Sequence, residues 1–144
     1  MGQKEKVITP SDRNAALNVI GVNVTVLTDS KTQKITFQSG MEGAGPPPHS
    51  HPWDESFYIT KGMVQFICNG KESNCHEGTF VNVPAGTVHA FSFGKGGGEM
   101  IEITASNSKA IQMFSALDRE ILPGPPDVPK VIEVAGEYDV EFHL

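Results

Sequence analysis

Apolar and polar residues alternate in short segments along the first two thirds of the chain. In the segment 21–28 the alternating positions are Val22, Val24 and Val26, which would share one face of a strand. Further strand-like segments span 34–38, 56–60, 63–68, 79–83, 89–93 and 99–104. Turn sequences separate them, at Lys61-Gly62, at Asn69-Gly70, over 84–87 and in a glycine-rich loop over 94–98. Period-two alternation interrupted by turns predicts an all-β domain.

After residue 104 the apolar spacing becomes that of a helix. Four apolar residues recur every three or four positions, namely Ile111, Phe114, Leu117 and Ile121. Ser106 to Ser108 offer an N-cap, the proline-rich run 122–126 would end this helix, and Pro129 could open a second short one. We expect the two helices to seal one end of a barrel. Their apolar face could also act as a lid that contacts substrate, and the two roles are compatible.

The composition fits one small domain that is rich in turns. The chain has 144 residues, of which 15 are glycine and 10 are proline, and 38% are hydrophobic. We expect an N-terminal arm or strand over 1–20, a barrel over 21–105, and a C-terminal helical segment over 106–144 that packs on the barrel.

Charge and hydropathy argue against several kinds of partner. The net charge is −6 and no basic cluster is present, which argues against nucleic acid and anionic membrane surfaces. No apolar run approaches the about 20 residues that a membrane span needs, and the N-terminus MGQKEKVITP lacks the apolar core of a signal peptide. We therefore expect a cytoplasmic protein.

The two cysteines are expected to be free thiols. A turn at Asn69-Gly70 would set Cys68 opposite Lys71 and bring Cys75 opposite a residue near Val64, so the two sulfurs would not meet. A zinc site from both cysteines and His76 would lack a convincing fourth ligand and the close spacing of such sites.

Two segments carry residues suited to one metal ion. His49 and His51 are two apart and would face the same side of a strand, and Glu55 has the same parity. The prolines at 46–48 stiffen the approach to this segment. His89 lies in a later strand-like segment, and three neutral imidazoles with one carboxylate suit a divalent ion while leaving coordination positions open.

Both segments resemble the signature motifs of the cupin superfamily. The first motif, G-x5-H-x-H-x3-E-x6-G, is met in full by Gly43, His49, His51, Glu55 and Gly62. The second, G-x5-P-x-G-x2-H-x3-N, is met by Gly78, Pro84, Gly86 and His89, and its last position is Phe93 in place of Asn. The resemblance implies a double-stranded β-helix, or jelly-roll barrel, with short C-terminal helices. It also implies that His49, His51, Glu55 and His89 bind a metal inside the barrel.

The run GAGPPPHSHPWDESFYITKG and the tail EYDVEF resemble the bacterial quercetin-dioxygenase-like branch of small single-domain cupins. This resemblance implies a dioxygenase that acts on a small aromatic or enolic substrate. Its cofactor would be one divalent transition metal, for which Fe, Mn, Ni, Co, Cu and Zn all remain open. Glu55 would serve both as a ligand and as the catalytic proton acceptor.

The replacement of the motif Asn by Phe93 predicts a more apolar pocket. If His89, Phe91 and Phe93 all point inward, two rings would line the cavity beside the metal. We list the pocket candidates as Phe57, Phe91, Phe93 and Phe114. The alternative is that these rings are ordinary core residues. Tyr58 is expected to face outward, His76 to be solvated and His143 to be frayed.

Two other functions remain open from the sequence, because one fold hosts many activities. One is a non-redox isomerase or lyase that acts on a small sugar or acid, with the metal as Lewis acid. The other is a ligand-binding module that holds the metal without turnover. A homodimer is expected on the family pattern, and apolar residues between Val7 and Ile20 could contribute a strand to it.

Overall fold

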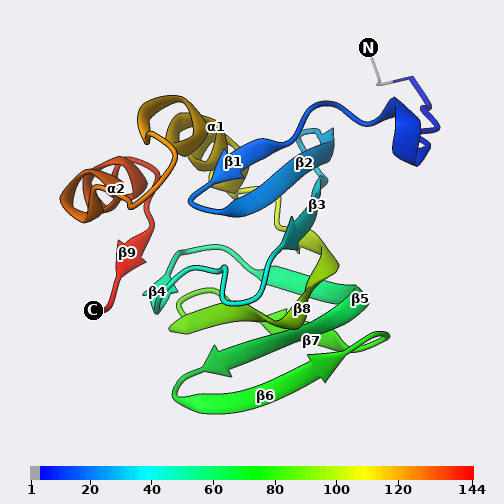
Figure 1. Ribbon diagram of the computed structural model, residues 1–144. Coiled ribbons are helices and arrows are strands. Elements are labelled where there is room, and N and C mark those ends of the chain that lie inside the picture. The colour runs from blue at the N-terminus through cyan, green and yellow to red at the C-terminus, as the bar shows by residue number, and fades with distance from the viewer. Residues whose placement is uncertain (1–3) are drawn as a thin grey trace.

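Strands are the main regular secondary structure of the computed structural model, which describes residues 4–144. In chain order the elements are η1 (Pro10–Asp12), β1 (Leu17–Val19), β2 (Val22–Asp29), β3 (Lys34–Gly40), β4 (His49–Ser50), β5 (Glu55–Cys68), β6 (Lys71–His76), β7 (Phe80–Val83), β8 (His89–Thr104), α1 (Ala110–Glu120), α2 (Val128–Gly136) and β9 (Glu141–Phe142). The strands form one curled sheet, and both helices lie at one side of it (Figure 1). The predicted all-β barrel with short C-terminal helices is confirmed.

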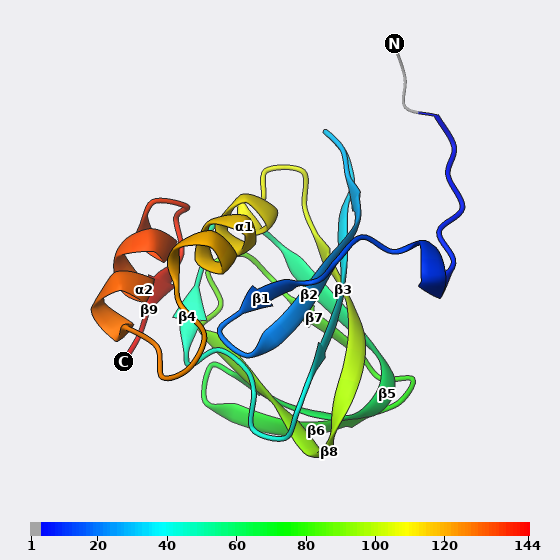
Figure 2. The ribbon, with the colours of Figure 1, turned by 45° about the horizontal axis from the view of Figure 1, so that its top comes forward.

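The sheet has a main path and a branch. Along the main path the strand order is β1-β2-β3-β8-β4-β9, and β5 pairs with β8, β6 and β7. Figure 2 shows these strands wrapped around a common interior, with α1 beside β1 and α2 beside β9. The N-terminal arm before β1 runs away from the barrel, and the C-terminus lies at α2 (Figures 1 and 2).

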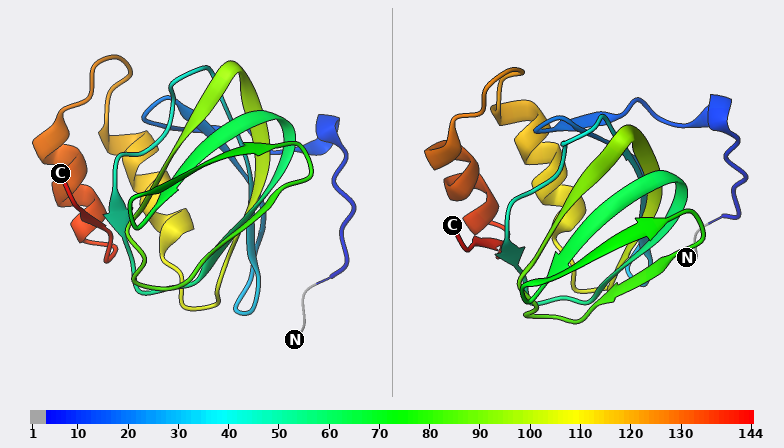
Figure 3. Two further views of the ribbon diagram at one scale, coloured as in Figure 1. Left: turned by 90° about the horizontal axis from the view of Figure 1, so that it is seen from below. Right: turned by 60° about the horizontal axis from the view of Figure 1, so that its bottom comes forward.

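The two longest strands, β5 and β8, bend back over themselves to close the barrel. They are antiparallel, so that Glu55 pairs with Thr104 at one end and Cys68 pairs with His89 at the other. A straight strand of this length would keep those ends about 40 Å apart. Yet the side chains of Glu55 and His89 are in contact, at 3.0 Å. Figure 3 shows the long green and yellow-green strands curving around the interior.

The bend lies where the register of β5 and β8 shifts, around Gly62. Gly62 has a φ of +70°, and a Cβ there would collide with the carbonyl oxygen of Gly97. Glycine is therefore required at this crossing for both its backbone angle and its small size. The shifted register is typical of the bulges that turn barrel corners.

The prediction of a glycine-rich loop over 94–98 is wrong. These residues are the middle of β8, and the segments predicted at 89–93 and 99–104 are the two halves of that one strand. In the same way, the segments at 56–60 and 63–68 are halves of β5. These glycines resemble a turn in the sequence, but in the structure they permit a sharp bend within a strand that remains paired. The backbone therefore keeps its ladder hydrogen bonds.

The helices pack a second apolar cluster against the barrel. α1 and α2 confirm the two predicted helices, and Ala116, Leu117, Val131 and Val134 are buried between them. Ser108 accepts a hydrogen bond from the backbone N–H of Ala110 at the start of α1. Both helices therefore bury apolar side chains and close the side of the sheet where β1 and β9 lie.

The cysteine prediction is confirmed in its register and in its outcome. Cys68 pairs with Lys71 and Cys75 pairs with Val64, and both cysteines are free thiols. Among residues 4–144 no helix is long and apolar enough to cross a membrane. Part of the N-terminal segment forms β1, which pairs with β2 of the same chain, and the homodimer stays a prediction.

Candidate metal centre and cavity

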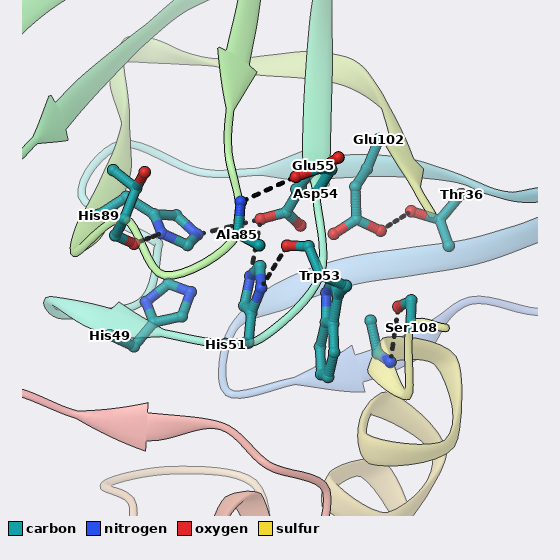
Figure 4. Close-up of polar contacts among 12 residues, drawn as sticks. Thr36, His49, His51, Trp53, Asp54, Glu55, Ala85, His89, Glu102 and Ser108 are labelled. Carbon is teal, nitrogen blue, oxygen red and sulfur yellow. Dashed lines mark hydrogen bonds and ion pairs between the residues drawn. The ribbon is translucent and has the colours of Figure 1, made fainter. Parts of the chain in front are cut away.

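The first motif and the second motif meet at one point inside the barrel. His49 lies in β4, His51 follows it, Glu55 begins β5 and His89 begins β8. One nitrogen from each of the three histidines lies within 4.8 Å of the others. Glu55 Oε1 is 3.1 Å from His51 Nε2 and 3.0 Å from His89 Nε2 (Figure 4). The structure thus brings together all four residues that the sequence singled out.

Each imidazole ring is oriented by a main-chain carbonyl at its Nδ1. The Nδ1 atoms of His49, His51 and His89 lie 2.8, 3.1 and 2.8 Å from the carbonyl oxygens of Pro47, Trp53 and Thr87, respectively. A carbonyl oxygen can only accept, so each Nδ1 carries a proton, and in the neutral ring Nε2 keeps its lone pair. Metal-binding histidines usually have this arrangement, in which the second nitrogen is tied to a carbonyl or carboxylate.

The contacts of Glu55 fit a cation at this point. In their neutral forms with the proton on Nδ1, His51 and His89 present Nε2 as an acceptor, and each Nε2 faces an acceptor oxygen of Glu55 at about hydrogen-bond distance. Such an arrangement needs a positive charge or a proton between the atoms. A divalent ion held by the three histidines and Glu55 would supply it, and the nitrogen and oxygen ligands suit a transition metal. The buried histidine cluster could therefore hold a metal.

The environment sets the charges of these groups. Burial, and then the neighbouring His89, lower the pKa of His49 to about 4, so that this ring is neutral at pH 7. Burial alone would raise the pKa of Glu55, but its contacts with Glu102, His51 and His89 outweigh this effect and hold the pKa well below its usual value. For His89 burial acts downward and the contact with Glu55 outweighs it, giving a raised pKa.

Glu102 is a buried acid at this site that the sequence analysis missed. It is 3% exposed, accepts a hydrogen bond of 2.9 Å from Thr36 Oγ1, and lies next to Glu55 (Figure 4). Burial, and then the charge of Glu55, raise its pKa well above the usual value. Gln38 Nε2 in turn donates to Thr36 Oγ1 at 3.2 Å. Together these side chains form a polar row along the inner face of β3 and β8.

The alternation in the segment 99–104 concealed Glu102. Ile101 and Ile103 read as the buried face, but Ile103 is 43% exposed while Glu102 and Thr104 point inward. In the first half of β8 the inward residues are His89, Phe91 and Phe93, at odd positions, whereas in the second half they lie at even positions. The inward parity of β8 therefore switches within the glycine-rich bend. A parity count continued from His89 across the bend therefore gives the wrong face for this half of the strand.

An apolar cavity of about 190 Å³ opens from the histidine cluster toward the helices. His49, His51, Glu55, Gln38 and Glu102 line its polar end. The rest of its wall is apolar and comes from β2, α1, α2 and the C-terminal residues, with Val24, Met113, Leu117, Val131 and Phe142 among the lining side chains. The position of α1 and α2 over this cavity agrees with both roles considered for the helices, as a seal and as a lid.

Two of the four predicted pocket rings line the cavity. Phe91 and Phe114 do so, whereas Phe57 and Phe93 are not among the lining side chains and are each 1% exposed. Phe57 packs on Phe66 at 4.9 Å between ring centroids, and Phe93 packs edge-on against Phe91 at 5.7 Å. The assignment of Phe57 and Phe93 to the pocket is thus corrected, because their rings fill the barrel core.

Of the three remaining expectations, those for Tyr58 and His76 are confirmed and that for His143 is wrong. Tyr58 faces outward and is 46% exposed, as predicted, and His76 is exposed. His143 is not frayed: its backbone N–H donates to Pro48 O at 2.9 Å, and its Nε2 lies 2.7 Å from Ser50 Oγ. The C-terminal strand β9 is thereby attached to β4, with Phe142 opposite His49.

Residues 37–103 match the family model described as the cupin domain. This part of the chain is similar to the cupin domain. It includes both motifs and therefore all four candidate ligands. No curated protein matches the sequence significantly.

Solved structures share the fold of the cupin domain at low sequence identity. An RmlC-like cupin from Shewanella frigidimarina is 17% identical with a TM-score of 0.68, over 77% of this chain and 99% of that one. The polyketide cyclase RemF from Streptomyces resistomycificus is 20% identical with a TM-score of 0.61, over 71% and 79%. A salicylate 1,2-dioxygenase from Pseudoaminobacter salicylatoxidans is 12% identical with a TM-score of 0.59, over 67% and 29%. A cyclase and a dioxygenase thus share this fold, which by itself does not select a reaction.

Proposed function

We propose that this cupin-like domain is a metal-dependent enzyme of the dioxygenase type, similar to the quercetin-dioxygenase-like branch. Its substrate would be a small, mainly apolar molecule with an enolic or phenolic hydroxyl group. The observation that carries the proposal is the opening of a three-histidine, one-glutamate centre into an apolar cavity. The polar end of the cavity suits the reacting oxygen, and the apolar wall suits the remainder of an aromatic or enolic substrate.

The metal would be held by His49, His51, His89 and Glu55, and when bound it would stabilise the negative charge of the deprotonated substrate oxygen. The residues of the chain have distinct tasks. The histidines are oriented through their Nδ1 hydrogen bonds. Glu55 is ionised and can accept the proton of the substrate hydroxyl at Oε1. The apolar wall keeps bulk water away from the deprotonated substrate.

A second candidate function is a non-redox metal-dependent isomerase or lyase. This alternative needs polar groups near the metal to hold the polar groups of a sugar or acid. Gln38 and Glu102 line the cavity beside the centre and meet part of that requirement. The mainly apolar wall favours the first candidate, because a small sugar would leave most of that surface uncovered.

The test begins with metal content, measured by mass spectrometry on protein purified without nickel affinity. We expect about one equivalent of Fe, Mn, Co, Ni or Cu in the wild type and in His76→Ala, an exposed histidine that serves as the matched control. His51→Ala and His89→Ala should lose the metal. Oxygen uptake with flavonols and catechols should then follow the metal content.

Three results would separate the candidates. Metal loss in both site variants together with oxygen uptake would support the dioxygenase. Zinc as the bound metal, with no oxygen uptake, would favour the isomerase or lyase. Absence of metal even after reconstitution with each ion would overturn the metalloenzyme and leave a barrel that binds ligands without a metal.

A further inference from the structure

The indole N–H of Trp53 is a buried donor without a partner. Trp53 is 1% exposed, and among the described residues its Nε1 is the buried side-chain polar atom that has no hydrogen-bond partner. An unpaired buried donor is unfavourable, because folding removes its hydrogen bond to water and nothing replaces it. Such groups are rare in native proteins, and each one requires an explanation.

Trp53 also lies beside the metal centre, in the wall of the cavity. Its ring stacks on the ring of His51 with 4.4 Å between centroids and an interplanar angle of 9° (Figure 4). The same residue lines the cavity wall. A molecule that fills the cavity and reaches the histidines therefore lies next to the indole ring.

The segment that carries Trp53 is fixed on both sides. The carbonyl oxygen of Pro52 accepts from Asn107 Nδ2 at 3.0 Å. Asp54 accepts from the backbone N–H of Ala85 at 2.9 Å through its side chain and from that of Ala105 at 3.1 Å through its carbonyl. The indole is therefore held in place before any ligand binds, which reduces the entropy that binding costs.

We propose that Trp53 is a ligand-binding residue whose indole N–H donates a hydrogen bond to an acceptor oxygen of the molecule in the cavity. The cavity volume limits that molecule. A cavity of about 190 Å³ is somewhat larger than the ~150 Å³ cavity that binds benzene. The ligand class is thus an apolar molecule of about one substituted ring that carries a carbonyl or similar acceptor. The inference rests on the proposed function only in taking this cavity as the substrate site.

The experiment uses two probes of nearly equal shape. Acetophenone carries a carbonyl oxygen, and isopropenylbenzene has a CH₂ group in its place. Their affinities are measured for the wild type, for Trp53→Phe, which keeps a stacking ring and removes the N–H, and for Gln38→Met, which removes another polar group at the cavity. All titrations are run with and without added divalent metal.

We expect acetophenone to bind the metal-free wild type about tenfold more tightly than isopropenylbenzene, as one hydrogen bond to a buried donor allows. Gln38→Met should keep this preference, and Trp53→Phe should abolish it without weakening isopropenylbenzene binding. The chain has one tryptophan, so a ¹⁵N spectrum contains one indole N–H signal. Acetophenone should move its proton downfield, and isopropenylbenzene should not.

Equal affinity of the two probes for the wild type would overturn the inference, and so would a preference that persists in Trp53→Phe or disappears in Gln38→Met. Failure of both probes to bind would also overturn it. If Trp53→Phe does not fold, the indole proton shift in the wild type decides. These readouts do not depend on turnover, so a protein that binds acetophenone through Trp53 but consumes no oxygen would keep this inference and lose the proposed function.

Discussion

Single residues at the metal centre owe their chemistry to the hydrogen bonds behind them. The Nδ1 contacts of His49, His51 and His89 with main-chain carbonyls direct three Nε2 lone pairs toward one point. Since these carbonyls belong to the backbone, no side-chain substitution elsewhere removes them directly. The centre therefore depends on local backbone geometry as much as on the ligand side chains.

The contribution of His49 to the stability of the metal-free protein should fall as the pH drops from 6.5 toward 4. The pKa of His49 is about 4 in the fold, so in this window the unfolded chain binds a proton that the folded chain does not. The free energy of unfolding contributed by His49 falls by at most about 3 kcal/mol over this window, and solvent screening of the partly exposed ring makes the fall smaller. Urea unfolding of the wild type, His49→Gln and His76→Gln across this range checks the expectation. A His49→Gln profile as steep as that of His76→Gln would contradict it.

The residues of this site differ in how well the sequence reveals them. His49, His51, Glu55 and His89 could be predicted, because their spacing and parity are local properties of two short segments. Glu102 could not, since the bend in β8 reverses the parity that alternation relies on. The role of Trp53 could not either, because an unpaired donor is recognised only when all its neighbours are known.

At the scale of elements, the bend shared by β5 and β8 forms the site. It brings the start of β5 to the start of β8 and so joins Glu55 to His89. The sequence predicted both halves of each strand and the glycines between them. It could not distinguish a bend from a loop, because glycine permits both and only the pairing of the two strands selects one.

Gly62→Ala should destabilise the fold much more than Gly70→Ala. Both glycines have a positive φ, so each alanine costs about 1 kcal/mol for its backbone angle. At Gly62 the new Cβ also collides with the carbonyl oxygen of Gly97, which should add about 2 kcal/mol, whereas Gly70 has open space. Denaturant unfolding of the two variants measures the difference. Equal losses would show that the close crossing of β5 and β8 is not required.

At the scale of the whole molecule, the cavity is lined by parts of the chain that are distant in sequence. Val24 comes from β2, Met113 from α1, Val131 from α2 and Phe142 from β9, and all of them line it. The sequence could predict that the helices cover the barrel, but not which rings face the cavity and which fill the core. That outcome depends on how the helices and the sheet pack. Phe91, for example, lines the cavity, whereas Phe93 lies in the core.

Metal binding should stabilise the whole domain. A divalent ion added at 100 times its Kd should raise the free energy of unfolding by about 2.7 kcal/mol, which corresponds to several degrees in Tm. Thermal unfolding with and without chelator measures this shift in the wild type, in His89→Ala and in the control His76→Ala. The shift should disappear only in His89→Ala, and an equal shift there would place the ion elsewhere on the protein.

The return of β5 and β8 onto themselves also has a consequence for the order of folding. Glu55 and His89 are 34 residues apart, and they meet only after the strand pair has formed and bent. We expect contacts of this kind to form after the transition state for folding, and they would then act on the rate of unfolding more than on the rate of refolding. A bound ion would therefore leave the speed of barrel formation nearly unchanged and would instead lengthen the lifetime of the barrel once it has closed.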